Sequence, residues 1–99
     1  MESGIQKLLR KLVMKKYPMY LDVKVHPYLE GSLRTDNPFN RKRYEVILVI
    51  HEERYKDFEE DWYSEIVEYV RDIAKYMDVE VMGFYNQIVD DELWEKMKK

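Results

Sequence analysis

Residues 44–51 have the sequence YEVILVIH, and this stretch decides the fold. Its alternate positions, from Tyr44 to Ile50, form one apolar face, as in a β-strand whose successive side chains point to opposite faces. Ile47 and Val49 make the other face apolar as well. A strand with two apolar faces is typical of the middle of a sheet that is covered on both sides. We therefore expect residues 44–51 to form the central strand of the domain.

Two further strands are expected beside it. Residues 19–26, MYLDVKVH, alternate strictly between apolar and polar side chains, which indicates a strand with one face in water. Residues 79–85, VEVMGFY, are typical of a third strand. We expect the first two strands to pair as an antiparallel hairpin and the third to follow a right-handed crossover. The hairpin loop, residues 27–43, is long, and loops of such length are usually functional or disordered.

Three segments have apolar residues at helical spacing. Ser3 opens the first helix with a capping-box pattern, and Pro18 ends it. The longest helix begins at Asp57 and runs to Met77, with one acidic face. Asp90 is the expected N-cap of a short last helix.

The order of these elements, α-β-β-α-β-α, predicts an α+β fold. A hairpin followed by a crossover strand makes a small three-stranded mixed sheet, and two long amphipathic helices are enough to cover one face of it. We expect a single two-layer domain over residues 1–99, with the helices packed mainly on one face of the sheet.

The composition limits the compartments in which the protein is expected. The chain has no cysteine, so disulfide and thiolate chemistry are excluded, and a fold held by packing alone suits a reducing compartment. The longest aliphatic run, residues 46–50, is far shorter than the about 20 residues of a membrane span. The amphipathic first helix is expected to face the protein core rather than a membrane surface. We expect a cytoplasmic protein, or one inside an assembled virion, with no membrane partner.

Residue types for catalysis and metal binding are poorly represented. His26 and His51 are expected at opposite ends of the hairpin, roughly 20 Å apart, which is too far to share an ion. No serine or threonine has the glycine elbow of a nucleophile, and the three glycines form no phosphate-binding loop. The paired carboxylates lie on a solvated helix face instead of in a pocket that would shift their pKa. We expect no enzymatic activity, no catalytic or metal-binding residue, no cofactor and no small-molecule substrate.

Charge is divided unevenly along the chain, and one interpretation is a nucleic-acid-binding adaptor. Residues 1–56 have 12 Lys and Arg against 7 Asp and Glu, whereas residues 57–99 have 5 against 13. A basic surface can hold phosphates, but the acidic half of the chain would repel them. The element order is similar to that of KH-type RNA-binding domains, but the GxxG clamp of those domains is missing from this sequence. On this alternative the binding residues would be the cations of the first helix and the hairpin loop, namely Lys7, Arg10, Lys11, Lys15, Arg34, Arg41, Lys42 and Arg43.

The interpretation that we favour is a non-enzymatic structural or assembly protein. Tyr, Trp and Met, of which the chain has nine, two and six, are enriched in protein–protein contacts. The short last helix is not expected to cover the second apolar face of residues 44–51, and a contiguous apolar patch marks a partner site. The expected interface residues are Ile47, Val49, Tyr28, Phe39, Arg41, Lys42 and Arg43 of the strand and loop, and Asp61, Glu65, Glu68 and Asp72 of the acidic helix face.

The partner on this interpretation is a second copy of the chain or a larger protein assembly. The three successive cations that begin at Arg41 would then dock on an acidic neighbour, whereas on the alternatives they would hold phosphates or simply be solvated. Connector and tail-terminator proteins of tailed phages have a comparable layout of elements with long hairpin loops. By that analogy of layout, we expect a small bacteriophage or viral virion component.

Overall fold

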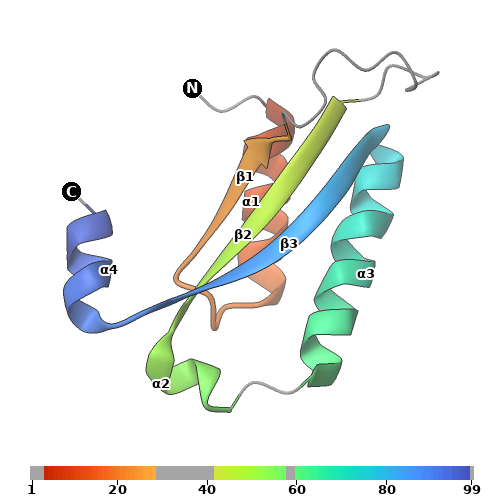
Figure 1. Ribbon diagram of the computed structural model, residues 1–99. Coiled ribbons are helices and arrows are strands. Elements are labelled where there is room, and N and C mark those ends of the chain that lie inside the picture. The colour runs from red at the N-terminus through yellow and green to blue at the C-terminus, as the bar shows by residue number, and fades with distance from the viewer. Residues whose placement is uncertain (1–3, 29–41, 58–59, 99) are drawn as a thin grey trace.

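The computed structural model describes residues 4–28, 42–57 and 60–98, and Figure 1 shows how their helices and strands are arranged. The two long helices are joined to a three-stranded sheet, and two short helices follow the ends of its strands. The elements in chain order are α1 (Gly4–Lys16), β1 (Asp22–Pro27), β2 (Lys42–His51), α2 (Glu52–Tyr55), α3 (Glu60–Tyr76), β3 (Val79–Val89) and α4 (Asp91–Met97).

The sheet has the strand order β1-β2-β3, so β2 is the central strand, as its two apolar faces predict. β1 and β2 pair antiparallel, from Asp22 opposite Val49 to Pro27 opposite Tyr44. β3 runs parallel to β2 after the α3 crossover, and the register is irregular between Tyr44 and Glu45. The partner of Tyr44 is residue 81 and that of Glu45 is residue 83, so Met82 is one extra residue in β3, as in a β-bulge.

Both long helices pack on the same face of this sheet. In Figure 1, α1 lies behind β1 and β2, and α3 runs beside β3. One core cluster joins buried side chains of α1 and α3 to those of the sheet; among them are Leu9, Val13, Val23, Val25, Val46, Leu48, Ile66 and Val70. The α+β fold, the mixed three-stranded sheet and the placing of the helices mainly on one face are therefore confirmed.

The elements differ from the sequence-based expectations mainly at their ends. β1 begins at Asp22 instead of residue 19, because Tyr20 turns into the core, where 3% of its surface is exposed. The longest helix begins at Glu60, and Asp57 lies before it in a turn. β3 continues to Val89, four residues beyond the expected end. Ser3 lies outside the described residues.

The short helix α2 was not expected, and its start depends on a histidine side chain. His51, the last residue of β2, is the N-cap, and its Nδ1 accepts a hydrogen bond from the Glu53 N–H over 3.1 Å. A nitrogen that accepts from a backbone N–H takes the part that Ser, Asp or Asn oxygens usually play. Asp90 follows Val89, the last residue of β3 and the register partner of His51. It caps α4 as predicted, because its Oδ1 accepts from the Leu93 N–H over 2.7 Å.

Candidate functional site: the open face of the sheet

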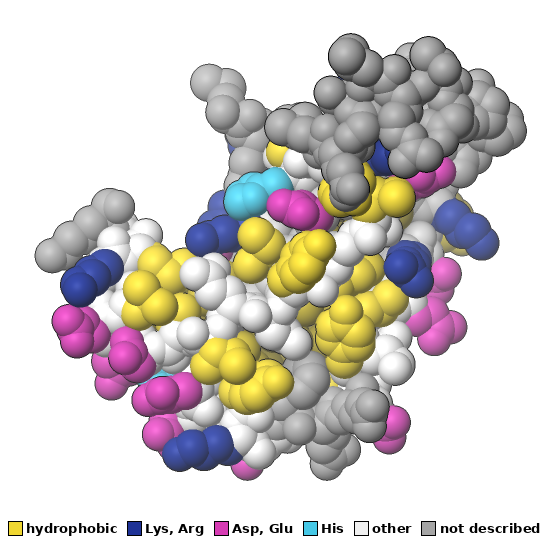
Figure 2. Space-filling model, in the orientation of Figure 1, with side chains coloured by type: hydrophobic (Ala, Val, Ile, Leu, Met, Phe, Trp, Pro, Cys, Tyr) yellow, Lys and Arg dark blue, Asp and Glu magenta, His cyan; other side chains and the backbone are white. Residues whose placement is uncertain are grey.

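The face of the sheet that is turned away from α1 and α3 is the candidate functional site. The strand registers place three residues in a row across its centre, Lys24 of β1, Ile47 of β2 and Tyr85 of β3. We call this surface the open face; its residues are Asp22, Lys24, His26, Glu45, Ile47, Val49, Gly83, Tyr85 and Gln87. Figure 2 shows this side of the molecule, with hydrophobic side chains in its middle and charged ones mostly around them.

Tyr85 is the largest exposed side chain of the open face. It is 52% exposed, and its ring lies along β3 over the backbone of Gly83. A Cβ at position 83 would approach the Tyr85 hydroxyl to 3.0 Å and the ring carbon Cε2 to 3.1 Å. The missing side chain of Gly83 thus provides the space that the aromatic ring of Tyr85 occupies beside the strand.

The two residues that suggested an uncovered face differ in their exposure. Ile47 is half-buried, so part of its side chain remains available on the open face. Val49 has no exposed surface and is enclosed by residues of its own chain. Val49 lies near the end of β2, where the Leu21 N–H donates to its carbonyl over 2.8 Å. The expected interface must therefore be corrected, because Val49 offers no surface to a partner and can only pack beneath the exposed residues.

Ion pairs hold charged side chains at the rim of the open face. Arg10 of α1 reaches Asp22 with an Nη2–Oδ1 distance of 3.0 Å, and Arg43 of β2 reaches Glu80 of β3 with an Nε–Oε2 distance of 3.3 Å. Arg10 and Arg43 were candidate phosphate-binding residues, and their charge is already balanced by a neighbouring carboxylate. Ile47 and Tyr85 thus form an apolar pair in the centre of the open face, with Lys24 beside Ile47 and compensated charges at the rim.

The hairpin loop contributes few described residues to the site. Tyr28 is half-buried, and its N–H donates to the Arg43 carbonyl over 2.8 Å, which extends the β1–β2 pairing by one residue. Lys42 is exposed at the start of β2. Arg34, Phe39 and Arg41 lie outside the described residues, so the expected docking role of the loop stays a prediction.

The acidic helix face does not adjoin the open face. Asp61, Glu65, Glu68 and Asp72 are all exposed along α3, on the helical layer of the molecule. Glu65 accepts a hydrogen bond from the Tyr17 hydroxyl over 3.5 Å, and burial together with this carboxylate raises the pKa of Tyr17. If the loop cations dock on this acidic face, we expect the two partners to belong to different copies of the chain.

The cations of α1 also lie on the helical layer. Lys7, Lys11 and Lys15 are exposed there, whereas the neighbouring Lys16 places its Nζ 4.2 Å from the centre of the Tyr69 ring of α3. The structure therefore does not bring the α1 lysines together with the rim of the open face, where Lys42 and Arg43 lie. No observation on the described residues favours the nucleic-acid alternative over the assembly one.

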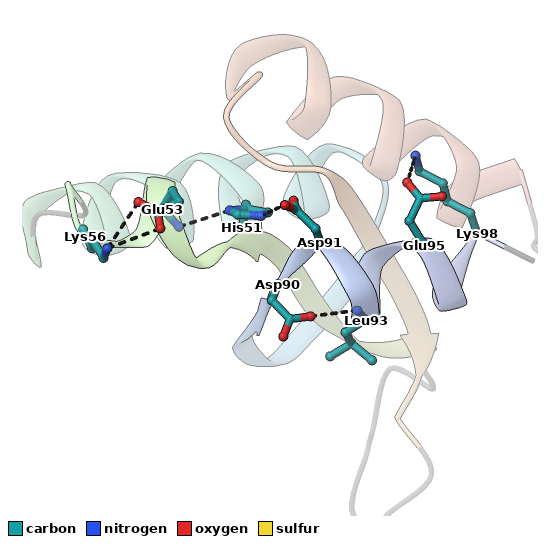
Figure 3. A network of polar contacts seen from close by, with 8 residues as sticks. All are labelled: His51, Glu53, Lys56, Asp90, Asp91, Leu93, Glu95 and Lys98. Carbon is teal, nitrogen blue, oxygen red and sulfur yellow. Dashed lines mark hydrogen bonds and ion pairs between the residues drawn. The ribbon is translucent and has the colours of Figure 1, made fainter.

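The two histidines lie at opposite ends of β2. His26 is paired with Glu45, six residues before His51 in the central strand. His51 instead links α2 to α4, because its Nε2 lies 2.7 Å from Asp91 Oδ1 while its Nδ1 accepts from Glu53 (Figure 3). This arrangement fixes the tautomer of the neutral ring, with the proton on Nε2. Sequence reasoning missed this contact, since nothing in the spacing of residues 51 and 91 indicates it.

Within the described ranges, no group of three or more His, Asp or Glu side chains is placed to hold a metal ion, and no helix is both long and apolar enough to cross a membrane. Comparisons with protein-family models, with curated proteins and with solved structures return no match to this chain.

Proposed function

We propose that the protein is a non-enzymatic assembly module whose open face binds another protein surface. The observation that supports this proposal most directly is the uncovered row of Ile47 and Tyr85 in the middle of a sheet whose opposite face holds the core cluster. A half-exposed tyrosine on a rigid strand is a good anchor for a contact, because it offers a large apolar area and loses little conformational freedom on binding.

The charges at the rim favour a protein partner over a polyanion. Arg10 and Arg43 are held by Asp22 and Glu80, so these two rim cations are compensated, and the half-buried Lys24 is the cation that adjoins Ile47. Polar rims around an apolar core are the usual anatomy of protein–protein interfaces. Burying the remaining half of one aromatic anchor contributes about 1–1.5 kcal/mol, so several such contacts in a repeated array would give a stable assembly. A virion component, as the layout of elements suggests, is the setting that we propose for it.

The proposal is tested by measuring self-association of Tyr85→Ser beside the wild-type protein. Light scattering and sedimentation velocity over a concentration series should show association of the wild type that the Tyr85→Ser variant loses in large part. The matched control is Tyr55→Ser, which removes a 38%-exposed tyrosine from α2, away from the open face, and should associate as the wild type does.

A larger partner is detected by placing a photo-crosslinking residue at position 85, and in parallel at position 55, in the cell that produces the protein. Crosslinks from position 85 alone agree with the proposal. Equal association of the wild type and the Tyr85→Ser variant, together with no specific crosslink from position 85, would overturn it.

A further inference from the structure

A second surface of the molecule lies on the side formed by α3 and β3, away from β1. A groove runs between the two elements here, and its walls are Arg71, Ala74 and Lys75 of α3 and residues 79–82 of β3. Met82, the extra residue of the bulge, is 43% exposed at this groove. We call this surface the α3–β3 flank; it comprises the groove and the charged residues Glu68, Arg71, Asp72 and Lys75.

The four charged side chains of the flank are exposed and lie within one to two helical turns of one another. None of them forms an ion pair with another described side chain; the one contact shown for the set places the Arg71 guanidinium 5.7 Å from the Phe84 ring centre. The short helix α4 behaves differently, because Lys96 pairs with Glu92 and Lys98 with Glu95 along its surface. These four charges, in the second half of α3, thus alternate in sign and are available to a partner.

The opposite edge of the sheet is closed to a neighbour. On β1, the Val23 N–H donates to Asp22 Oδ1 over 2.9 Å, and the buried Gln6 side chain donates to the Val25 carbonyl over 2.6 Å. Pro27 has no N–H to offer. Such side-chain bonds and prolines are the means by which proteins keep an edge strand from pairing.

β3 has one charged residue, Glu80, and it pairs with Arg43 of β2 over 3.3 Å. Residues 81–89, VMGFYNQIV, form the longest run of the sequence without Asp, Glu, Lys or Arg. The Tyr63 hydroxyl of α3 donates to the Phe84 carbonyl over 3.3 Å, which ties the helix to the strand at this side. A second copy that approaches with the same side therefore meets one carboxylate of the strand, Glu80, which Arg43 already neutralises, so the exposed charges of α3 set the alignment.

We propose that the α3–β3 flank binds the same flank of a second copy of this chain around a two-fold axis, with α3 antiparallel to its counterpart. An axis that passes midway between Arg71 and Asp72 places each of these residues opposite the other in the second copy. Glu68 and Lys75 are equally distant from that midpoint, so the same axis also places Glu68 opposite Lys75. Within residues 68–75, the order acid, base, acid, base is therefore complementary to itself when reversed, which is the condition for an isologous contact.

This contact uses a different surface from the open face and is independent of it. Exposed ion pairs add little free energy, so the charges select the register while Met82 and the groove beside it supply the apolar contact. A closed two-fold pair leaves both open faces free. Use of both surfaces would therefore build assemblies larger than two copies.

A charge exchange within one chain tests the proposal. Glu68→Lys, Lys75→Glu and the double variant are made in the Tyr85→Ser background, so that any contact through the open face is removed. We expect the background protein to form a dimer whose dissociation constant rises about tenfold or more in each single variant. The double variant should return to within a few-fold of the background, because every opposite-charge pair across the axis is then restored.

A matched control exchanges Glu92 and Lys96 on α4, a pair of opposite charges with similar exposure, and should leave the dimer unchanged. Circular dichroism of each variant confirms that the helices are intact. A monomeric Tyr85→Ser background, or a double variant as weak as the single ones, overturns the two-fold pairing. If the Tyr85→Ser protein is monomeric and the wild type associates, the two-fold pairing is wrong and the proposed function of the open face stands. If both proteins form the same dimer and the wild type forms nothing larger, the proposed function is wrong and the two-fold pairing stands.

Discussion

The Tyr85 ring covers Gly83 on the same face of β3, with the Tyr85 hydroxyl 3.0 Å from the position that a Cβ at residue 83 would occupy. Glycine in a strand is normally a weak point, because it has no side chain to pack and a large conformational freedom to lose. The ring compensates by packing on the exposed backbone. At the same time, its outer side is turned to solvent in the centre of the open face.

Replacing Gly83 with Ala should therefore give opposite results in two backgrounds. With Tyr85 present, the new methyl group pushes the movable ring outward, and we expect unfolding free energy to stay equal or fall by up to about 1 kcal/mol. With Tyr85→Ser, the space is free, and the lower conformational entropy of alanine in the unfolded chain should stabilise the fold by about 0.4–1 kcal/mol. Urea denaturation of the four proteins measures the coupling, and equal effects in both backgrounds would show that ring and glycine are independent.

Gln6→Met should destabilise the domain by about 1–3 kcal/mol. Gln6 is 8% exposed, and its amide donates to the Val25 carbonyl of the edge strand over 2.6 Å. Methionine has a similar volume but no donor, so a buried carbonyl would lose its partner. The control is Lys7→Met on the exposed side of the same helix, which should change stability by less than about 0.5 kcal/mol in the same denaturation measurement.

Tyr20→Phe should leave the fold as stable at neutral pH or slightly more stable. The hydroxyl of Tyr20 is buried without a hydrogen-bond partner among the described residues, so its removal costs no bond. Unchanged calorimetric behaviour, or a small rise in melting temperature, is the expected result. A loss of more than about 1 kcal/mol would show that the hydroxyl has a partner that stabilises the fold.

The same residue predicts a loss of stability in alkali. Burial, with a smaller effect of Tyr17, raises the pKa of Tyr20 from 10.0 to about 12. The folded state thus holds the phenol proton more tightly than the unfolded state, so its contribution is complete below pH 10 and is lost as pH rises toward 12. The difference corresponds to about 2–3 kcal/mol. Unfolding free energy measured from pH 9 to 12 should fall less steeply for Tyr20→Phe, and parallel curves would contradict the assignment.

His51→Ala should loosen the C-terminal helix and shorten α2, because it removes both the cap on the Glu53 N–H and the contact with Asp91. We expect a cost of about 1 kcal/mol, typical of a lost N-cap, and faster hydrogen exchange in α2 and α4. Asp91→Ala removes the second contact alone, so exchange should rise in α4 and not in α2. Equal protection of α4 in the wild type and both variants would show that the link has no effect on its docking.

The sequence predicts the centre of this fold better than its margins. Large apolar side chains at both Val46 and Ile47 can belong only to a strand between two others, and β2 is central. The end of β3 was missed because Met82 interrupts the alternation and because Asn86 and Gln87 are polar. A bulge depends on the backbone of the neighbouring strand, so alternation within β3 cannot indicate where one occurs.

The sequence predicts that the candidate site is a partly uncovered face of the sheet, but it does not predict every residue of that face. Two apolar faces on residues 44–51 suggest that some of the second face stays uncovered, and Ile47 and its neighbour Tyr85 do remain exposed in part. Val49 has no exposed surface, and a side chain's burial depends on tertiary packing, which no local pattern contains. Tyr85 was read as part of a strand, but its position over Gly83 requires the side-chain direction that only the folded strand provides.

Because α1 and α3 pack on the same side of the sheet, the molecule has one helical side and one open face. Copies that associate through their open faces must turn their lysine- and glutamate-rich helices toward the surrounding water. The outside of such a particle would be well solvated although each copy has an apolar patch, and the particle's size would be limited by the number of open faces that can meet.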